Sequence, residues 1–352
     1  MIINKNFVSA NIAVKRIIDD TVYLENQIRD TTEDWFYWAF KVENAAGRTI
    51  KFVFDKVRIG YNGAAVSHDL ANWSWSYTRV DDMSFTYTFG EDENLVYFAH
   101  NMVYSPEMFN TFCRKKGILV KTLCRDRKGR DVPYVEFGEG DKTILLTSRH
   151  HACESSGTFV LEGVIEQFFN NPIKGLHLVA VPFVDFDGVV DGDQGKARGP
   201  HDHNRDYSDD FEPLYPTVKA IKEIAENADL EYAFDFHSPW HIGGENDTVF
   251  IVRNSKEPEK YNRMTDFAKI LEGCITDASL PYKAQNDHEP DVTWNDTSHS
   301  TYANFMLNTM GAKLAFTLET AYFKASGVDF CPEKAKELGR CFAEAVRKYS
   351  AQ

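Results

Sequence analysis

The sequence predicts an α/β domain with a mixed, largely parallel sheet flanked by helices, preceded by an antiparallel β-sandwich domain. Up to about residue 112, short aromatic and β-branched runs alternate with turn residues, as in antiparallel strands. Beyond that point apolar strand-like runs alternate with helical patterns, which is typical of a sheet of parallel strands. The chain has 352 residues, enough for two such domains. We expect the domains at residues 1–112 and 113–352.

The first domain is expected to consist of short strands, and the clearest are at residues 35–42, 50–54, 85–89 and 95–99. Residues 44–47 and 90–94 are rich in turn formers and predict hairpin connections. The aromatic stripe along these strands could form a carbohydrate platform, but regular alternation is more typical of a buried core. We therefore expect a core role for these side chains.

The second domain shows strand and helix patterns in alternation. Helical spacing of apolar residues follows Glu154, recurs at residues 218–225, and returns in a closing amphipathic helix at 332–348. The segments 185–207 and 281–302 are long and polar, and loops of that length are usually functional or mobile. Strands are expected at 118–123, 132–137, 143–147, 176–183, 230–236, 248–252 and 313–318.

Charge and composition exclude several kinds of partner. Lys and Arg number 39 against 53 Asp and Glu, so the net charge of −14 disfavours nucleic acid and anionic membranes. No segment approaches the roughly 18 consecutive apolar residues of a membrane span. The six cysteines are scattered, which indicates free thiols in a reducing compartment. Without a secretory pattern at the N-terminus, we expect a cytoplasmic protein, and the sequence does not indicate its oligomeric state.

Polar residues that could bind a ligand follow several of the predicted strands. Ligands of open α/β sheets bind at the carboxyl ends of the strands. His151 and Glu154 follow one strand and would project to the same side of a helix. His237 follows a second strand, and Glu319 follows a third. His-x-x-Glu alone is a weak signal, since a loop histidine beside a helix-start glutamate has other uses.

These residue types fit the chemistry of a hydrolytic metal site. A catalytic zinc needs three protein ligands and one open position, which His151, Glu154 and His237 supply for one Zn²⁺ per chain. Glu319 is then free to act as general base on zinc-activated water. Arg205 offers a planar fork for a substrate carboxylate, and Asn204 is a neighbouring donor.

Several histidines and one aspartate leave alternatives open. His150 could replace His151 as the ligand, although the spacing to Glu154 favours His151. His201 and His203 could form a second metal site, but a polar hydrogen-bonding network is the simpler interpretation. Asp235 either orients a zinc-bound histidine or only ends a strand.

In chain order, five motifs follow apolar strands: His-x-x-Glu, Asp-Gly, Asn-Arg, His-Ser and Thr-Leu-Glu, at residues 151–154, 187–188, 204–205, 237–238 and 317–319. Together they resemble the zinc metallocarboxypeptidases. The aromatic residues 35–38 and the stretch 98–104 look like the extra domain of the cytosolic carboxypeptidase branch, including its bacterial members. The resemblance covers nearly the whole chain and implies a zinc carboxypeptidase-like second domain.

The resemblance also implies roles for individual residues. His151, Glu154 and His237 would hold zinc, and Glu319 would serve as general base and later proton donor. Asn204 and Arg205 would anchor the terminal carboxylate of a peptide or protein substrate. The pocket for the terminal side chain would be lined partly by three further residues, Asn304, Phe305 and Thr317.

The chain departs from the family pattern where relatives carry an arginine that polarises the scissile carbonyl. Gly195 stands at that position, and we expect Lys196 or Arg198 to substitute. A displaced cation would still stabilise a developing oxyanion, without bidentate geometry. The resemblance further implies a substrate-contacting tyrosine, for which Tyr302 is the first candidate and Tyr282 the second.

The sequence thus favours a zinc-dependent metallocarboxypeptidase, in which Glu319 promotes attack of zinc-bound water on the last peptide bond. One alternative keeps the zinc but acts on N-acyl amino acids or peptidoglycan-type amides, since related sites serve related substrates. A second alternative is a non-catalytic zinc-containing binding protein. Retention of Glu319 speaks against that alternative, because a binding protein has no need of a general base.

Overall fold

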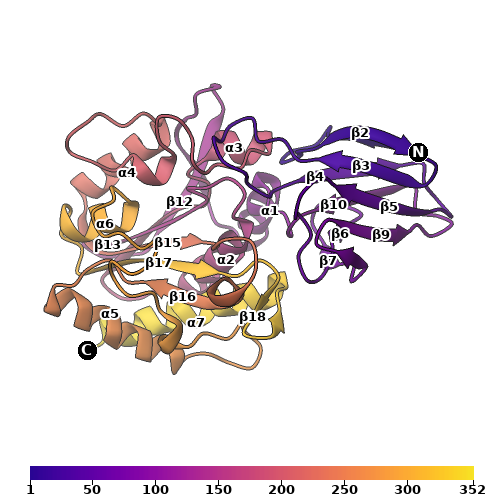
Figure 1. Ribbon diagram of the computed structural model, residues 1–352. Coiled ribbons are helices and arrows are strands. Elements are labelled where there is room, and N and C mark those ends of the chain that lie inside the picture. Colours follow the sequence, from indigo (N-terminus) through magenta and orange to yellow (C-terminus); the bar gives the residue numbers. More distant parts are fainter.

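The computed structural model describes residues 1–352, and it consists of a β domain beside a larger α/β body (Figure 1). The β domain contains ten strands: β1 (Ile2–Asn4), β2 (Ala13–Ile18), β3 (Thr21–Glu25), β4 (Ala39–Glu43), β5 (Thr49–Phe54), β6 (Ala65–Ser67), β7 (Trp73–Trp75), β8 (Arg79–Asp81), β9 (Ser84–Thr88) and β10 (Leu95–Ala99). They form two five-stranded sheets, with the orders β1-β4-β10-β6-β7 and β2-β3-β5-β9-β8.

Aromatic side chains fill the space between these two sheets. Phe40 and Phe98 from one sheet lie against Phe52 and Phe85 from the other, with ring centroids 4.9 to 5.6 Å apart. All four are fully buried, because alternate residues of each strand face the same core. The expected core role is therefore confirmed for these four side chains, whereas residues 35–38 precede β4 and Trp35 lines a cavity.

Two details of the β domain differ from expectation. The turns at residues 44–47 and 90–94 do not close hairpins, because each connects a strand of one sheet to a strand of the other. In addition, β3 and β5 pair in parallel, so the sandwich is not wholly antiparallel. A turn-rich sequence signals a change of direction and does not specify the sheet in which the next strand pairs.

The second sheet has seven strands: β11 (Val120–Arg125), β12 (Asp131–Phe137), β13 (Lys142–Ser148), β14 (Leu176–Val181), β15 (Asp229–His237), β16 (Val249–Val252) and β17 (Leu314–Thr320). Their order is β11-β12-β14-β13-β15-β17-β16. The four central strands β14, β13, β15 and β17 run parallel, whereas β12 and β16 pair antiparallel at the two sides. The predicted α/β class with a mixed, largely parallel sheet is confirmed.

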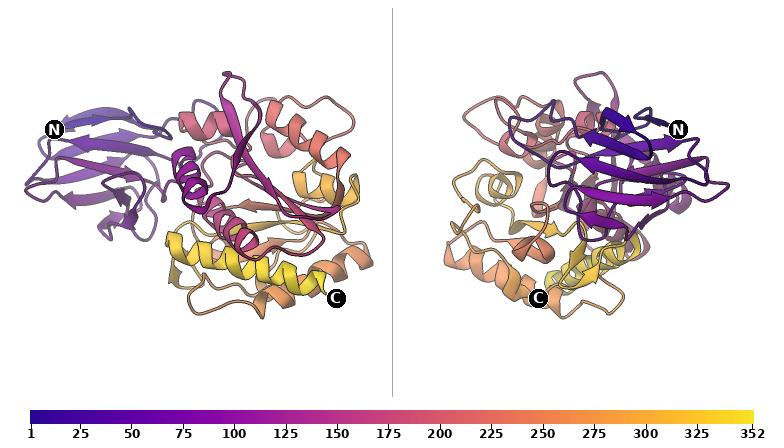
Figure 2. Two further views of the ribbon diagram at one scale, coloured as in Figure 1. Left: turned by 180° about the vertical axis from the view of Figure 1, so that it is seen from behind. Right: turned by 45° about the vertical axis from the view of Figure 1, so that its right-hand side comes forward.

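Helices cover both faces of this sheet (Figure 2). Alternation along β13 sends Ile144 and Leu146 into the core shared with α2, α5 and α7, while Leu145 faces the core shared with α4 and α6. The helices are α1 (Pro106–Lys116), α2 (Ser155–Asn170), α3 (Phe186–Asp191), α4 (Pro216–Asn227), α5 (Pro258–Glu272), α6 (Tyr302–Asn308) and α7 (Pro332–Ser350).

The expected strands of the second domain and the helices after Glu154, at 218–225 and at 332–348 correspond to observed elements, whereas α1, α3, α5 and α6 are additional, and α3 lies in the segment expected to be a loop. The division between residues 112 and 113 stays a prediction and falls inside α1. A short ribbon, β18 (Lys324–Ala325) and β19 (Val328–Asp329), completes the fold. None of the helices combines the length and apolar character needed to cross a bilayer.

Candidate active site

The candidate site lies where three of the four central strands, β13, β15 and β17, end. Parallel register places Thr147 beside Asp235 and His237 beside Glu319. The polar residues predicted from separate stretches of the sequence therefore meet at one edge of the sheet. This edge is the carboxyl end of the parallel strands, where ligands of such folds bind.

A tight turn connects β13 to α2 and carries the first two candidate ligands. Arg149 has a φ of 59°, and its buried guanidinium donates hydrogen bonds to the carbonyls of Ala152 and Tyr104. Glu154 immediately precedes α2, and its backbone N–H donates to the carbonyl of His151 at 3.2 Å. The expectation that His151 and Glu154 share a helical face was wrong, because a turn brings them together.

The three predicted metal ligands converge on the carboxylate of Glu154. Its Oε1 lies 2.8 Å from Nδ1 of His151, and its Oε2 lies 2.8 Å from Nδ1 of His237. One ligand atom from each residue falls within 4.8 Å of the others, and all three residues are buried. Two imidazoles and one carboxylate form the donor set of a catalytic zinc site, so the residues fit this metal.

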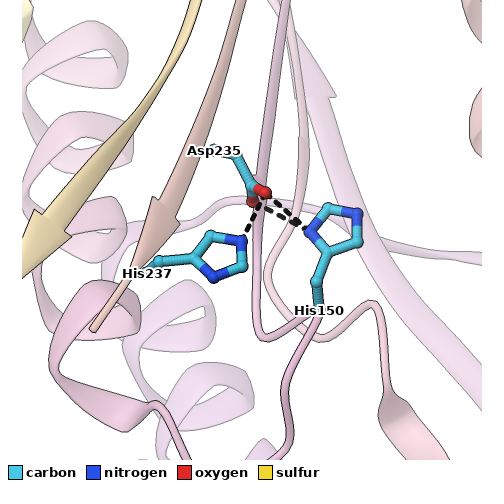
Figure 3. A group of neighbouring side chains, drawn as sticks. All are labelled: His150, Asp235 and His237. Carbon is cyan, nitrogen blue, oxygen red and sulfur yellow. Dashed lines mark hydrogen bonds and ion pairs between the residues drawn. The ribbon is translucent and has the colours of Figure 1, made fainter. Parts of the chain in front are cut away.

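Two further titratable side chains, His150 and Asp235, adjoin the candidate ligand His237 (Figure 3). Asp235 interacts with Nδ1 of His150 at 2.9 Å and with Nε2 of His237 at 2.5 Å. His150 also contacts the Tyr207 hydroxyl through Nε2 at 2.8 Å, so both of its ring nitrogens have partners. His150 is fully buried and does not line the cavity, which favours His151 as the ligand. Asp235 thereby orients His237 and leaves Nδ1 of that ring directed at Glu154.

Burial and neighbouring charges perturb the protonation of the site. Burial lowers the pKa of His151 to about 4 and so favours the neutral imidazole that a metal requires. Burial would raise the pKa of Glu154, but His151, Lys196 and His237 hold it well below its usual range. Burial raises the pKa of Glu319 to about 7, in the range suited to a group that both accepts and donates a proton.

The ligands open into a cavity of about 820 Å³, which His151, His237 and Glu319 help to line. Oε2 of Glu319 is buried and has no hydrogen-bond partner. Glu33 and Trp35 of the β domain also line this cavity. A cavity of similar volume, about 840 Å³, lies beside α1 and α7 and contains none of the predicted site residues.

Asn204 and Arg205 line the cavity from the short 3₁₀ helix His203–Arg205. The side chain of Asp202 accepts a hydrogen bond from the Asn204 backbone N–H at 3.0 Å and so caps this turn. Oδ1 of Asn204 accepts a hydrogen bond from the backbone N–H of Tyr302 at 3.1 Å, which fixes its amide. Arg205 forms no ion pair, and its only hydrogen bond, at 3.4 Å, is to the carbonyl of Asn204. Its guanidinium remains available to an anion.

The backbone at position 195 leaves no room for an arginine side chain. Its φ is +83°, and a Cβ there would lie 2.0 Å from the backbone nitrogen of Ala152, in the turn that carries His151. Lys196, the next residue, lines the cavity and places Nζ 3.1 Å from Oε1 of Glu154 and 4.8 Å from the centre of the Trp35 ring. Lys196 is thus the cation nearest to the candidate ligands.

Arg198 does not share this position. Its guanidinium pairs with Asp30, Asp185 and Asp193 at 2.9 to 3.2 Å, and its side chain is outside the cavity. Asp30 also accepts hydrogen bonds from the backbone of Gln194 and Gly195, so the β domain holds the loop that carries Lys196. The expectation of Arg198 as an oxyanion cation is corrected, because three carboxylates already neutralise it.

The tyrosine expectation is corrected as well. Tyr302 is fully buried and its hydroxyl donates to the carbonyl of Leu145 at 2.8 Å. Tyr282 is also fully buried, with its hydroxyl on Asp287. Neither lines the cavity, and no other tyrosine does. Of the three residues expected around the terminal side chain, Asn304 and Thr317 line the cavity, whereas Phe305 packs in the core.

The remaining histidines of the 185–207 segment form a hydrogen-bonding and stacking network. Nε2 of His201 lies 2.7 Å from Asp206, and the ring of His203 stacks on Tyr215 at 3.5 Å. Asp202 lies 3.8 Å from Nε2 of His151. The network supports the loop that presents Asn204 and Arg205.

Comparison with known proteins shows which proteins this chain is similar to. Residues 3–100 match the cytosolic carboxypeptidase N-terminal domain family. The whole chain superposes on a metallo-carboxypeptidase from Burkholderia cenocepacia with a TM-score of 0.80, covering 99% of this chain and 98% of that one at 18% identity. The fold is therefore that of the metallo-carboxypeptidases, as the sequence motifs predicted.

Cytosolic carboxypeptidases are also among the relatives in sequence. An uncharacterized protein of Zymomonas mobilis is 24% identical over 254 residues, which cover 67% of each chain. Cytosolic carboxypeptidase 2 of Xenopus tropicalis is 20% identical over 75% of this chain, and the match spans only 32% of that larger protein. The resemblance to the cytosolic carboxypeptidase branch and its bacterial structural neighbours is thus confirmed.

Proposed function

We propose that this protein is a zinc-dependent metallocarboxypeptidase that hydrolyses the C-terminal peptide bond of peptides or proteins. One observation carries the proposal. The buried set of His151, Glu154 and His237 opens into the same cavity as the unpartnered carboxylate of Glu319 and the unpaired guanidinium of Arg205. The cavity thus combines a metal site, a base and an anion anchor, which are the parts that exopeptidase chemistry requires.

His151, Glu154 and His237 would hold the zinc, whose role is to polarise the scissile carbonyl and to lower the pKa of water to about 7. Glu319 takes a proton from the attacking water and later delivers it to the leaving amine. Its raised pKa suits both steps. Lys196 contributes positive charge where the carbonyl oxygen becomes negative.

Arg205 and Asn204 account for the choice of the last peptide bond. Arg205 binds the terminal carboxylate through its planar fork, and Nδ2 of Asn204 supplies a further donor. Holding this carboxylate positions the preceding amide for attack. The six cysteines are all unpaired, which supports a reducing, cytoplasmic setting for this activity.

Paired peptides with free and amidated C-termini test the proposal. The zinc-loaded protein should cleave only the free form, and Glu319→Gln should retain zinc and lose at least about 1000-fold in turnover. Glu226→Gln changes an exposed glutamate on α4 and serves as the matched control. Cleavage of amidated peptides, or of N-acyl amino acids alone, would favour an amidohydrolase. Zinc binding without any hydrolysis would favour a binding protein.

A further inference from the structure

One wall of the cavity adjoins Glu319 on the neighbouring edge strand. β16 pairs with β17 so that Phe250 lies opposite Glu319 and Val252 lies opposite Thr317. Val252 and Thr317 both line the cavity, as does Asn254 two residues further along. β16 therefore runs one strand spacing from β17, and its cavity-lining residues Val252 and Asn254 come two and four residues after the residue opposite the proposed base.

Two amide side chains that line the cavity, one just after β16 and one on α6, are buried without full hydrogen bonding. Asn254 is 4% exposed, and neither its Oδ1 nor its Nδ2 has a partner. Asn304 is 7% exposed; its Nδ2 donates to the carbonyls of Thr297 and His299 at 3.1 and 2.9 Å, which leaves Oδ1 unpartnered. Buried polar groups nearly always have partners, so these three atoms indicate a place for a hydrogen-bonding ligand.

The wall carries no free charge to match an acidic side chain. Arg253, beside Asn254, directs its guanidinium to Asp287 at 3.1 Å and to Thr265 at 2.9 Å, and it does not line the cavity. The only lysine and arginine that line the cavity are Lys196 and Arg205, and the proposed function uses both. An acidic terminal side chain on this wall would therefore be buried without a counter-ion.

We infer that Asn254 and Asn304 select a C-terminal residue with a neutral hydrogen-bonding side chain, and a carboxamide (glutamine or asparagine) above all. The inference rests on the proposed function. A carboxamide has an NH₂ group for Oδ1 of Asn304 and Oδ1 of Asn254, and a carbonyl oxygen for Nδ2 of Asn254. An aliphatic side chain of the same size would leave all three atoms unpaired.

N-acylated dipeptides that end in glutamine, asparagine, leucine, glutamate or lysine provide the test. We expect kcat/KM for the carboxamides to exceed that for the other three by about 10-fold or more, since unpaired buried groups penalise the wrong substrate. Asn254→Leu should remove this preference and favour leucine, at unchanged zinc content. Asn308→Leu, at an exposed position on the same helix as Asn304, is the control. An identical order of substrates in wild type and Asn254→Leu, or a wild-type preference for glutamate, lysine or leucine, would overturn the inference.

Measurements of ligand binding test this inference independently of the proposed function. Calorimetry on the zinc-loaded Glu319→Gln variant should show tighter binding of N-acetyl-glutamine than of N-acetyl-leucine, and Asn304→Ala should reduce the difference even if Asn254→Leu does not fold. Selective binding without any peptide cleavage by the wild type would refute the proposed activity and support the inferred selectivity for a carboxamide. Cleavage of all five peptides at similar rates would keep the activity and refute the selectivity.

Discussion

Oδ2 of Asp235 lies 2.5 Å from Nε2 of His237, while the opposite ring nitrogen, Nδ1, faces Glu154 at 2.8 Å. A hydrogen bond to Asp235 places the ring proton on Nε2 and leaves Nδ1 free to bind a metal. The aspartate near the end of β15 thus sets the tautomer of a candidate zinc ligand. This interaction favours an orienting role for Asp235 over the alternative that it only ends a strand.

Asp235→Asn should weaken zinc binding by about 10- to 100-fold, because the asparagine amide cannot replace the carboxylate as an acceptor for both histidines. Competition with a chromogenic chelator measures the affinity directly. His150→Gln is the informative companion variant, since His150 shares Asp235 but does not line the cavity. We expect that variant to lose stability with a smaller effect on zinc affinity. Equal zinc affinity in wild type and Asp235→Asn would refute the orienting role.

Lys196→Met should move the acidic limb of the kcat/KM profile to higher pH. Burial raises the pKa of Glu319 to about 7, and the positive charge of Lys196 opposes this rise. Removing the charge raises the pKa further. A base must be deprotonated to act, so activity is lost at a higher pH than in the wild type. A bound metal would act in the same sense as Lys196, so we expect the wild-type limb at or below about pH 7.

The same substitution should lower kcat by about 100- to 1000-fold at the pH optimum if Lys196 stabilises the oxyanion. Lys174→Met, at an exposed position away from the cavity, is the control and should leave both the limb and the rate unchanged. A lower rate with an unmoved limb would show that Lys196 does not influence Glu319.

Arg205→Leu should lower kcat/KM for free C-termini by about 10- to 100-fold, the usual effect of losing a charge-assisted hydrogen bond. Discrimination against amidated peptides should fall by the same factor, because Arg205 is the group that reads the carboxylate. Arg125→Leu removes an exposed arginine and controls for the change in net charge. An unchanged ratio of free to amidated cleavage in Arg205→Leu would assign the anchor elsewhere.

The metal set and the base could be predicted because their positions follow from local patterns. His151, His237 and Glu319 each come at or just after the end of an apolar run, and parallel strands bring their carboxyl ends to one edge. The chemistry of these residue types then suggests their roles. The same reasoning predicted the fold class, since period and composition are properties of neighbouring residues.

The errors concern features that depend on distant parts of the chain. Arg198 is neutralised by Asp30, 168 residues away in the sequence, together with two nearer carboxylates. Tyr302 is turned into the core by the carbonyl of Leu145. The placement of Trp35 and Glu33 at the cavity depends on how the β domain docks on the sheet, and no local pattern records that.

Gly195 provides a test of how closely the two halves of the site are packed. A methyl group at Gly195 would overlap the backbone of Ala152, and its positive φ of 83° adds strain. Gly195→Ala should therefore lower the free energy of unfolding by about 3 kcal/mol or more, the sum of backbone strain and overpacking. Gly129→Ala is a matched control, because Gly129 has a φ of +79° with open space around it. That variant should lose only about 1 to 2 kcal/mol from the strained φ.

Because the strained contact is with the turn that carries His151, the effect of Gly195→Ala should extend to the metal. Zinc affinity should fall in Gly195→Ala and stay at the wild-type value in Gly129→Ala. Urea unfolding of the metal-free proteins, with a chelator competition on the folded ones, measures both quantities. Equal losses of stability in the two variants would mean that the 195–196 loop can move away from Ala152, and that the place of Lys196 beside Glu154 does not depend on a glycine before it.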